Sequence, residues 1–206
     1  MSAFDKIVDA VTPPESAEKR AEARAEARAA AAPGDWLSAI LDHHEAIEEA
    51  FAAAGAAGDA AQCRAALKRL GELLNGHSMA EEAVVYPALA EMGKGGHAEM
   101  AYTEQVAAKL QLAALETMDP LSEDYRDKLG HLQGAVAHHI YKEESDWFID
   151  LKREAAPATQ QRIARRYAEE YGRYIRGGET IAGAGRLPGE ERSFSPGAGS
   201  TPPPVV

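Results

Sequence analysis

The chain has 206 residues, a formal net charge of −11 at pH 7 and a single cysteine, Cys63. No stretch approaches the ~18 consecutive apolar residues of a membrane span, and one cysteine excludes an internal disulfide or a thiolate metal cluster. The acidic balance argues against a nucleic-acid partner, and the first residues lack the apolar core of a secretory signal. With 43 alanines and abundant Glu and Arg, the composition favours helices. We therefore expect a cytoplasmic, all-α protein that binds neither membrane nor nucleic acid.

The chain divides into four predicted segments. Residues 1–34 form an Ala/Glu/Arg-rich helical extension, and residues 35–156 hold the main helical domain. Residues 157–176 form an additional helix that ends at Gly177-Gly178. Residues 177–206 contain seven glycines and five prolines, so we expect a disordered tail. The N-terminal extension is expected to cover the main domain, to form a homodimer or to dock on an unknown protein partner.

The main domain contains four predicted helices with apolar faces. Glycine-rich turns separate the first three, and Asp119-Pro120 suits the start of the fourth because aspartate caps helices and proline fits their first turn. A kink is expected near Pro87. The short connections favour antiparallel neighbours, so the predicted fold is an up-down-up-down four-helix bundle. These helices are expected at residues 35–54, 59–91, 97–117 and 120–155.

Polar residues recur on the apolar faces of all four helices when successive residues are placed ~100° apart around each helix axis. Each helix contributes one histidine, and the second, third and fourth helices each add a glutamate. Two other histidines, His43 and His138, have better-placed neighbours and are predicted to lie at the surface. The seven residues on the apolar faces are His44, His77, Glu81, His97, Glu104, His139 and Glu143.

The three glutamates on these faces call for a nearby cation. A carboxylate in an apolar interior is strongly unfavourable unless it is paired or bound to a metal ion. No Lys or Arg lies centrally on these faces near the glutamates. Seven nitrogen and oxygen donors exceed what one tetrahedral ion needs, so two metal ions fit better. The donor set has no sulfur and suits iron, manganese or zinc.

Two segments of the chain repeat one pattern. Residues 77–86 and residues 139–148 both read H-x-x-x-E-E-x-x-x-aromatic. A histidine and a glutamate four residues apart lie on the same helix face, so both pairs can bind one dinuclear centre. Tyr86, the aromatic residue of the first copy, is expected by default to pack as an ordinary core side chain, with gating of oxidants or electron relay as the alternative.

These segments resemble a known family. The run Asp42-His-His-Glu-Ala-Ile-Glu-Glu-Ala-Phe51, the two repeats and the Tyr86-Pro87 pair are similar to hemerythrin-like proteins of the HHE cation-binding type, over roughly residues 36–155. The resemblance implies a four-helix bundle that holds a non-haem, usually dinuclear, iron centre and meets O₂, peroxide or NO. By the same pattern, the metal ligands are His44, His77, Glu81, His139 and Glu143.

The third helix departs from the family pattern. The O₂-carrying members have two histidines four apart there, whereas here Ala101 follows His97 at that spacing. Many bacterial members carry Glu-His in this helix, whereas this chain has Glu104-Gln105. We therefore expect His97 and Glu104 as ligands, with the alternative that Glu104 only hydrogen-bonds a ligand imidazole. A third carboxylate favours ferric over ferrous iron, so we hypothesise a centre that reacts with oxidants rather than releasing O₂ reversibly.

Two further functions stay open from the sequence. The same site would also suit a module that stores iron, or senses iron or redox state, without catalytic turnover. An inert bundle whose extension and tail recruit a partner is the third possibility. Ferritin-like iron oxidation fits less well, because that pattern pairs a glutamate with a histidine three residues later.

Overall fold

The computed structural model describes residues 15–183, and its side chains over residues 15–175. These residues form helices joined by turns, with no strand among them, which confirms the all-α class for this part of the chain. Two short π-helical turns, η1 (Glu81–Val85) and η2 (Glu143–Trp147), interrupt the α-helices. In chain order, the α-helices are α2 (Ala17–Ala30), α3 (Trp36–Ala56), α4 (Ala60–Ala80), α5 (Tyr86–Glu91), α6 (Gly95–Thr117), α7 (Glu123–Lys142), α8 (Phe148–Glu154) and α9 (Pro157–Gly183).

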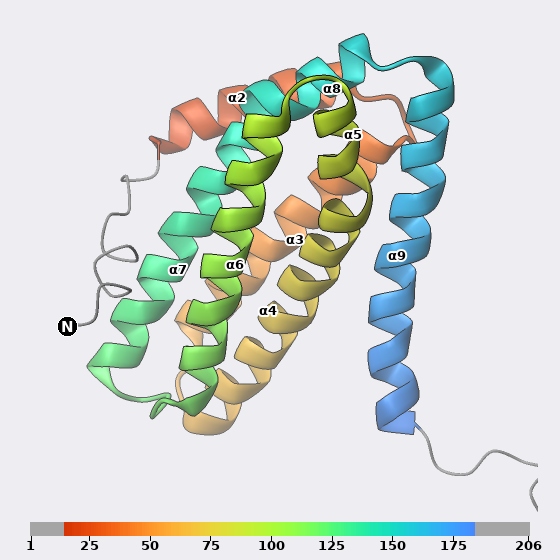
Figure 1. Cartoon of the computed structure of the whole chain (residues 1–206). Helices are drawn as coiled ribbons and strands as arrows, with labels where there is room; N and C mark the ends of the chain where they lie inside the picture. Colours follow the sequence, from red (N-terminus) through yellow and green to blue (C-terminus); the bar gives the residue numbers. More distant parts are fainter. Residues whose placement is uncertain (1–14, 184–206) are drawn as a thin grey trace, which may run out of the picture.

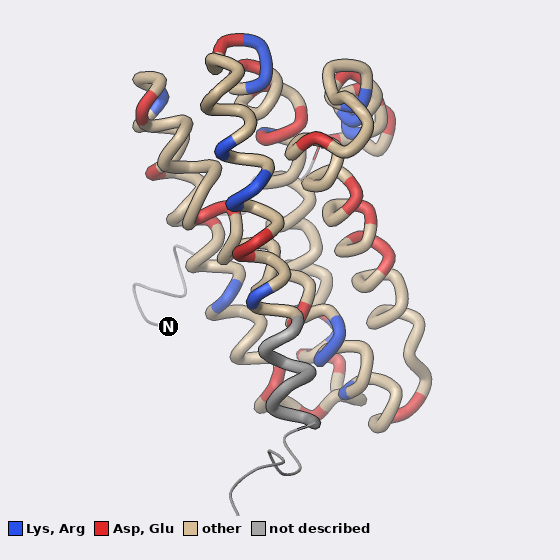
Figure 2. The backbone as a smooth tube through the Cα atoms, turned by 90° about the vertical axis from the view of Figure 1, so that its right-hand side faces the viewer, with Lys and Arg blue, Asp and Glu red and all other residues tan. Residues whose placement is uncertain are grey.

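Helices α3, α4, α6 and α7 lie side by side, and the remaining long helices cover them (Figure 1). Helix α2 crosses one end of this group together with α8, and it contacts α3, α7 and η2. Helix α9 runs along the outer side of α4 and α3. The view in Figure 2 looks onto α9, which carries both acidic and basic residues along its described length. None of the described helices combines the length and the apolar character needed to cross a lipid bilayer.

The described part of the N-terminal extension, residues 15–34, packs on its own chain. Ser16 caps α2 by accepting a hydrogen bond from the amide of Lys19 at 3.3 Å. Two residues of the same helix, Ala23 and Ala27, are buried. These contacts offset the weak repulsion between like charges four residues apart on α2. The described part of the extension therefore covers the main domain, which is one of the three expected roles.

The expected start of the fourth main helix is wrong. Helix α7 begins at Glu123, where the Ser122 hydroxyl accepts a hydrogen bond from the amide of Tyr125 at 3.1 Å. The carboxylate of Asp119 accepts instead from the amide of Leu121 at 3.1 Å, and this contact closes a turn ahead of the helix.

The expected end of the last helix is also wrong. Helix α9 continues through Gly177-Gly178 and ends at Gly183, so residues 177–183 of the expected tail are helical. Two adjacent glycines lower helix propensity but do not by themselves end a helix. Residues 184–206, which make up the rest of the expected tail, lie outside the described residues.

The two π-helical turns coincide with the two copies of the sequence repeat. In η1 the amide of Tyr86 bonds to the carbonyl of Glu81, and in η2 the amide of Phe148 bonds to the carbonyl of Glu143. Each turn thus begins at the first glutamate of its repeat. Pro87, near which a kink was expected, follows the first turn, but no proline follows the second. Single π-helical turns within α-helices occur frequently at functional sites.

The core consists of two apolar clusters with polar residues between them. On α3, Leu41 belongs to the first cluster and Ile47 to the second, and His44 lies between the two. On α4, Leu74 belongs to the second cluster, and His77 follows it toward the first. The helices therefore carry their buried polar residues into the interior at the junction between the two clusters.

Candidate metal centre

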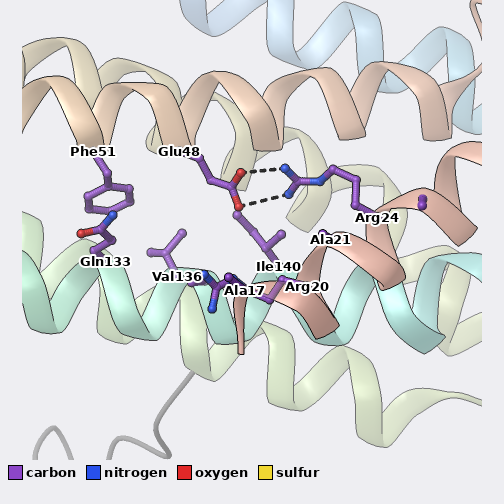
Figure 3. A pocket seen from close by; sticks show the side chains of 11 residues that line it. Ala17, Arg20, Ala21, Arg24, Glu48, Phe51, Gln133, Val136 and Ile140 are labelled. Carbon is purple, nitrogen blue, oxygen red and sulfur yellow. Dashed lines mark hydrogen bonds and ion pairs between the residues drawn. The ribbon is translucent and has the colours of Figure 1, made fainter. Parts of the chain in front are cut away.

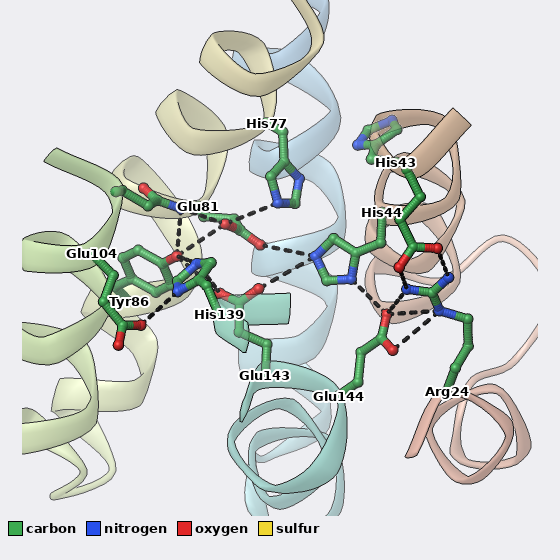
Figure 4. Close-up of polar contacts among 12 residues, drawn as sticks. Arg24, His43, His44, His77, Glu81, Tyr86, Glu104, His139, Glu143 and Glu144 are labelled. Carbon is green, nitrogen blue, oxygen red and sulfur yellow. Dashed lines mark hydrogen bonds and ion pairs between the residues drawn. The ribbon is translucent and has the colours of Figure 1, made fainter. Parts of the chain in front are cut away.

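Four buried side chains meet at this junction: His44 from α3, His77 from α4, Glu81 from η1 and Glu143 from η2 (Figure 4). One donor atom from each lies within 4.8 Å of the others. His44 Nε2 is 3.3 Å from Glu143 Oε2 and 4.0 Å from Glu81 Oε1. His77 Nε2 is 3.2 Å from Glu81 Oε2. Two imidazoles and two carboxylates thus converge on one small volume.

The chemistry of this cluster fits a metal cation. The buried atoms His44 Nε2, His77 Nε2, Glu81 Oε1 and Glu143 Oε2 make no hydrogen bond within the described residues. In the same part of the chain, neither carboxylate forms an ion pair with Lys or Arg. Unpaired carboxylates and imidazole nitrogens are costly to bury, and one cation would satisfy all four atoms.

Burial and crowding also shift the pKa values in the cluster. Burial and the neighbouring Glu143 raise the pKa of Glu81 to about 8. Burial lowers the pKa of His44, but the neighbouring carboxylates of Glu143 and Glu144 outweigh that effect and raise this pKa to about 9. The metal-free cluster therefore holds protons at neutral pH, and a cation that binds there displaces them.

His139 lies on the other side of Glu143 from His44 (Figure 4). Its Nε2 is 3.2 Å from Glu143 Oε1, so the two oxygens of Glu143 face two different histidines. Burial lowers the pKa of His139, but Glu143 and Glu104 outweigh that effect and raise it to about 10. Glu143 therefore lies between His44 and His139 and has one oxygen close to each of them.

Tyr86 contacts the residues of the centre, although core packing was its default expectation. Its hydroxyl is 3.0 Å from Glu81 Oε2, 2.9 Å from Glu143 Oε1 and 3.2 Å from His139 Nε2. The Gln105 amide donates to this hydroxyl at 2.5 Å and to Glu81 at 2.7 Å. The π-helical turn contributes to this arrangement, because its backbone hydrogen bond joins residues five apart, from the amide of Tyr86 to the carbonyl of Glu81.

Replacing Tyr86 with phenylalanine is expected to lower the free energy of unfolding of the metal-free protein by about 1–3 kcal/mol, because the buried carboxyl groups of Glu81 and Glu143 lose the hydroxyl that lies within hydrogen-bond distance of both. Denaturant titration of chelator-treated protein measures this change. The control is Tyr141→Phe, since the half-buried Tyr141 makes no hydroxyl hydrogen bond within the described residues, and it should change stability by less than about 0.5 kcal/mol. Equal losses in both variants would contradict the role of the Tyr86 hydroxyl.

On α6, the residue that reaches the cluster is Gln105 rather than Glu104. Gln105 is buried, whereas the half-buried Glu104 accepts a hydrogen bond from His139 Nδ1 at 2.9 Å and one from Lys142 at 2.5 Å. Glu104 thus lies one imidazole away from the cluster, as in the alternative weighed for it. Successive helical residues differ by ~100°, so an error of about 50° in the expected facing of α6 is enough to exchange these two neighbours.

His97 lies at the start of α6 and does not join the four-residue cluster. Its ring stacks on Trp147 with 5.3 Å between the ring centroids, and its buried Nδ1 has no hydrogen-bond partner in the described part of the chain. The structure thus brings His44, His77, Glu81, His139 and Glu143 together and leaves His97 and Glu104 apart. The ligand role of all seven stays a prediction.

Partners outside the cluster hold the far nitrogens of two imidazoles. Nδ1 of His44 donates to Glu144 at 2.7 Å, and Nδ1 of His77 is 3.1 Å from the Tyr167 hydroxyl of α9. That hydroxyl is also 2.9 Å from Nδ1 of His43, which is half-buried under α9 rather than at the open surface as expected. Glu144 is the second glutamate of the repeat, and this doubling was the only sequence signal for these partners. Such contacts orient ligand imidazoles and tune their basicity.

Comparisons with known proteins agree with this geometry. The family model for the hemerythrin HHE cation binding domain matches residues 36–151. Over 79 residues the chain is 29% identical to a protein described as "DNA nickase" from Nostoc sp. (strain PCC 7120 / SAG 25.82 / UTEX 2576), covering 38% of this chain and 22% of that protein. No solved structure matches the chain significantly. Because the family match covers more than half of the residues and contains every member of the buried cluster, the chain belongs to the hemerythrin HHE cation-binding domain family.

Proposed function

We propose that this metal-binding member of the family is a cytoplasmic, non-haem di-iron protein that reacts with O₂, peroxide or NO. In this proposal, α3, α4, α6 and α7 form an up-down-up-down bundle around the two ions. The observation that carries the proposal is the buried set of four unsatisfied donor atoms on His44, His77, Glu81 and Glu143. Iron would supply a redox-active Lewis acid there, and manganese or zinc would suit the same nitrogen and oxygen donors.

The residues divide into two sides that share carboxylates. His44 and His77 would hold one ion, and His139 would hold the other. Glu143 supports this division because its two oxygens face His44 and His139 at 3.3 and 3.2 Å. The Tyr86 hydroxyl, on the His139 side, contacts both carboxylates.

Carboxylates behind the imidazoles favour an oxidised centre. The expected third carboxylate, Glu104, does not enter the cluster, but it accepts a hydrogen bond from His139, and Glu144 accepts one from His44. A carboxylate in this position makes an imidazole a stronger donor, which stabilises ferric over ferrous iron. The centre is therefore expected to be oxidised by O₂ rather than to release it.

Metal content per chain tests the proposed site first. Elemental mass spectrometry of aerobically purified protein is expected to find about two irons per chain, because two groups of buried donors share Glu143. One zinc per chain, or no metal even after reconstitution with ferrous iron, would contradict the di-iron proposal.

Exposure of the reduced protein to O₂ then tests the reactivity. The protein is reduced without oxygen and then exposed to O₂, and we expect the iron to be oxidised irreversibly. Absorption spectroscopy monitors this reaction. A stable oxygenated adduct that returns intact O₂ under argon would indicate a carrier instead. A single stoichiometric oxidation without turnover would favour the storage or sensing alternative.

A further inference from the structure

Arg24 of α2 lies between two carboxylates of different exposure. Its Nε is 3.0 and 3.1 Å from the two oxygens of Glu144, and its terminal nitrogens contact Glu48 at 2.6 and 3.2 Å. The side chain of Glu48 is 42% exposed, whereas that of Glu144 is 1% exposed. Arg24 and Glu48 line a pocket of about 520 Å³ between α2, α3 and α7 (Figure 3). Arg24 thus connects this open side of the molecule to a fully buried carboxylate.

Glu144 in turn contacts a residue of the metal centre. Its Oε1 is 2.7 Å from Nδ1 of His44, whose other nitrogen, Nε2, faces Glu81 and Glu143 (Figure 4). A proton held on Nδ1 by this hydrogen bond leaves the Nε2 lone pair free for a cation. A carboxylate that accepts this proton strongly makes the imidazole more electron-rich, and a guanidinium on the same carboxylate weakens that effect.

Docking of α2 alone does not explain why an arginine contacts Glu144. One turn further along α2, Arg28 contacts Asp42 at 2.7 Å and Glu45 at 2.9 Å on α3. Both of those carboxylates are exposed, so Arg28 joins α2 to α3 without any contact to the buried cluster. Arg24 differs because it neutralises a buried carboxylate that is already bonded to a candidate ligand.

We propose that Arg24 is a positioning residue that sets, through Glu144, how strongly His44 donates electrons to the bound metal. This inference rests on the proposed function. The extension outside the family-matched segment is then part of the centre's electrostatic environment. Losing the guanidinium removes a nearby positive charge and also leaves Glu144 a stronger acceptor, and both changes stabilise ferric iron. Losing the charge of Glu144 acts in the opposite direction.

The test compares reduction potentials of the iron-loaded full chain by anaerobic redox titration. Arg24→Met is expected to lower the potential, so that the ferric-to-ferrous ratio at a fixed applied potential rises about tenfold, equivalent to ~59 mV for one electron. Glu144→Gln is expected to shift it in the opposite direction. Arg24→Lys, which keeps the charge, should remain closer to the wild-type potential than Arg24→Met. Arg28→Met is the matched control and should leave the potential unchanged.

Three outcomes would overturn the inference while the proposed function stands. The first is an iron-loaded Arg24→Met variant with the wild-type potential. The second is an equal shift in Arg28→Met, which would indicate that loss of α2 docking is the cause. The third is a shift of the same sign in Glu144→Gln. A wild-type chain that binds no iron would instead overturn the proposed function, and this inference with it.

Discussion

Replacing His77 with alanine is expected to weaken iron binding more than 100-fold while the helices stay folded. Removing a residue that only hydrogen-bonds a metal ligand typically lowers metal affinity 10–100-fold. Because His77 would itself be a ligand, its loss should cost more. The fold should survive because His77 Nε2 makes no hydrogen bond within the described residues. Removing the ring therefore breaks no hydrogen bond on the side that faces the cluster. Iron per chain after dialysis, together with far-UV circular dichroism, measures both parts of this prediction.

Two further variants make this experiment specific. His131→Ala is the matched control, because His131 is exposed on α7, two turns before His139, and should leave the iron content unchanged. His139→Ala should lose the ion on its own side of Glu143 and retain the other. Unchanged iron content in His77→Ala would refute the assignment of the buried cluster as a metal site.

Loading the wild-type chain with iron is expected to raise its Tm by about 8–16 °C. A ligand present at a thousand times its Kd stabilises the folded state by about 4.1 kcal/mol, and each kcal/mol shifts the Tm of a chain of this size by about 2–4 °C. The physical source is the relief of buried carboxylates and imidazoles that lack partners in the metal-free structure. Thermal melts with iron, without metal and after chelation measure this gain.

The gain in Tm must depend on the cluster. His77→Ala is expected to show little or no increase with iron, whereas His131→Ala should match the wild-type chain. Equal gains in wild-type and His77→Ala protein would mean that iron binds elsewhere, on surface carboxylates for example. Such a result would separate unspecific stabilisation of an acidic protein from occupancy of the buried site.

The sequence predicted much of the fold because apolar periodicity is strong on α3, α4 and α7. It placed His44, His77 and His139 on the inner faces, and all three are buried. Helix α6 was harder, since alanines on several sides leave its apolar face poorly defined. As a result, Glu104 was expected where Gln105 lies.

The partners of the cluster could not be predicted, because they come from distant parts of the chain. Arg24 and Glu144 are 120 positions apart, and the contact between His77 and Tyr167 spans 90. Periodicity describes one helix at a time and does not specify which outer residue of another helix it meets. The π-helical turns were missed for a related reason, since one extra residue per turn alters the local facing without an obvious signature in composition.

Helices α2 and α9 lie outside the segment that matches the family, yet both contribute to the surroundings of the cluster. Tyr167 of α9 contacts His77 directly, and Arg24 of α2 contacts Glu144, which is bonded to His44. A graft of residues 36–151 into another protein would therefore carry the donors without their full surroundings. Glu144 would lose its arginine, and Nδ1 of His77 would lose the Tyr167 hydroxyl. The portable unit for engineering is thus larger than the family-matched segment, and it extends from the cap of α2 at Ser16 to at least Tyr167.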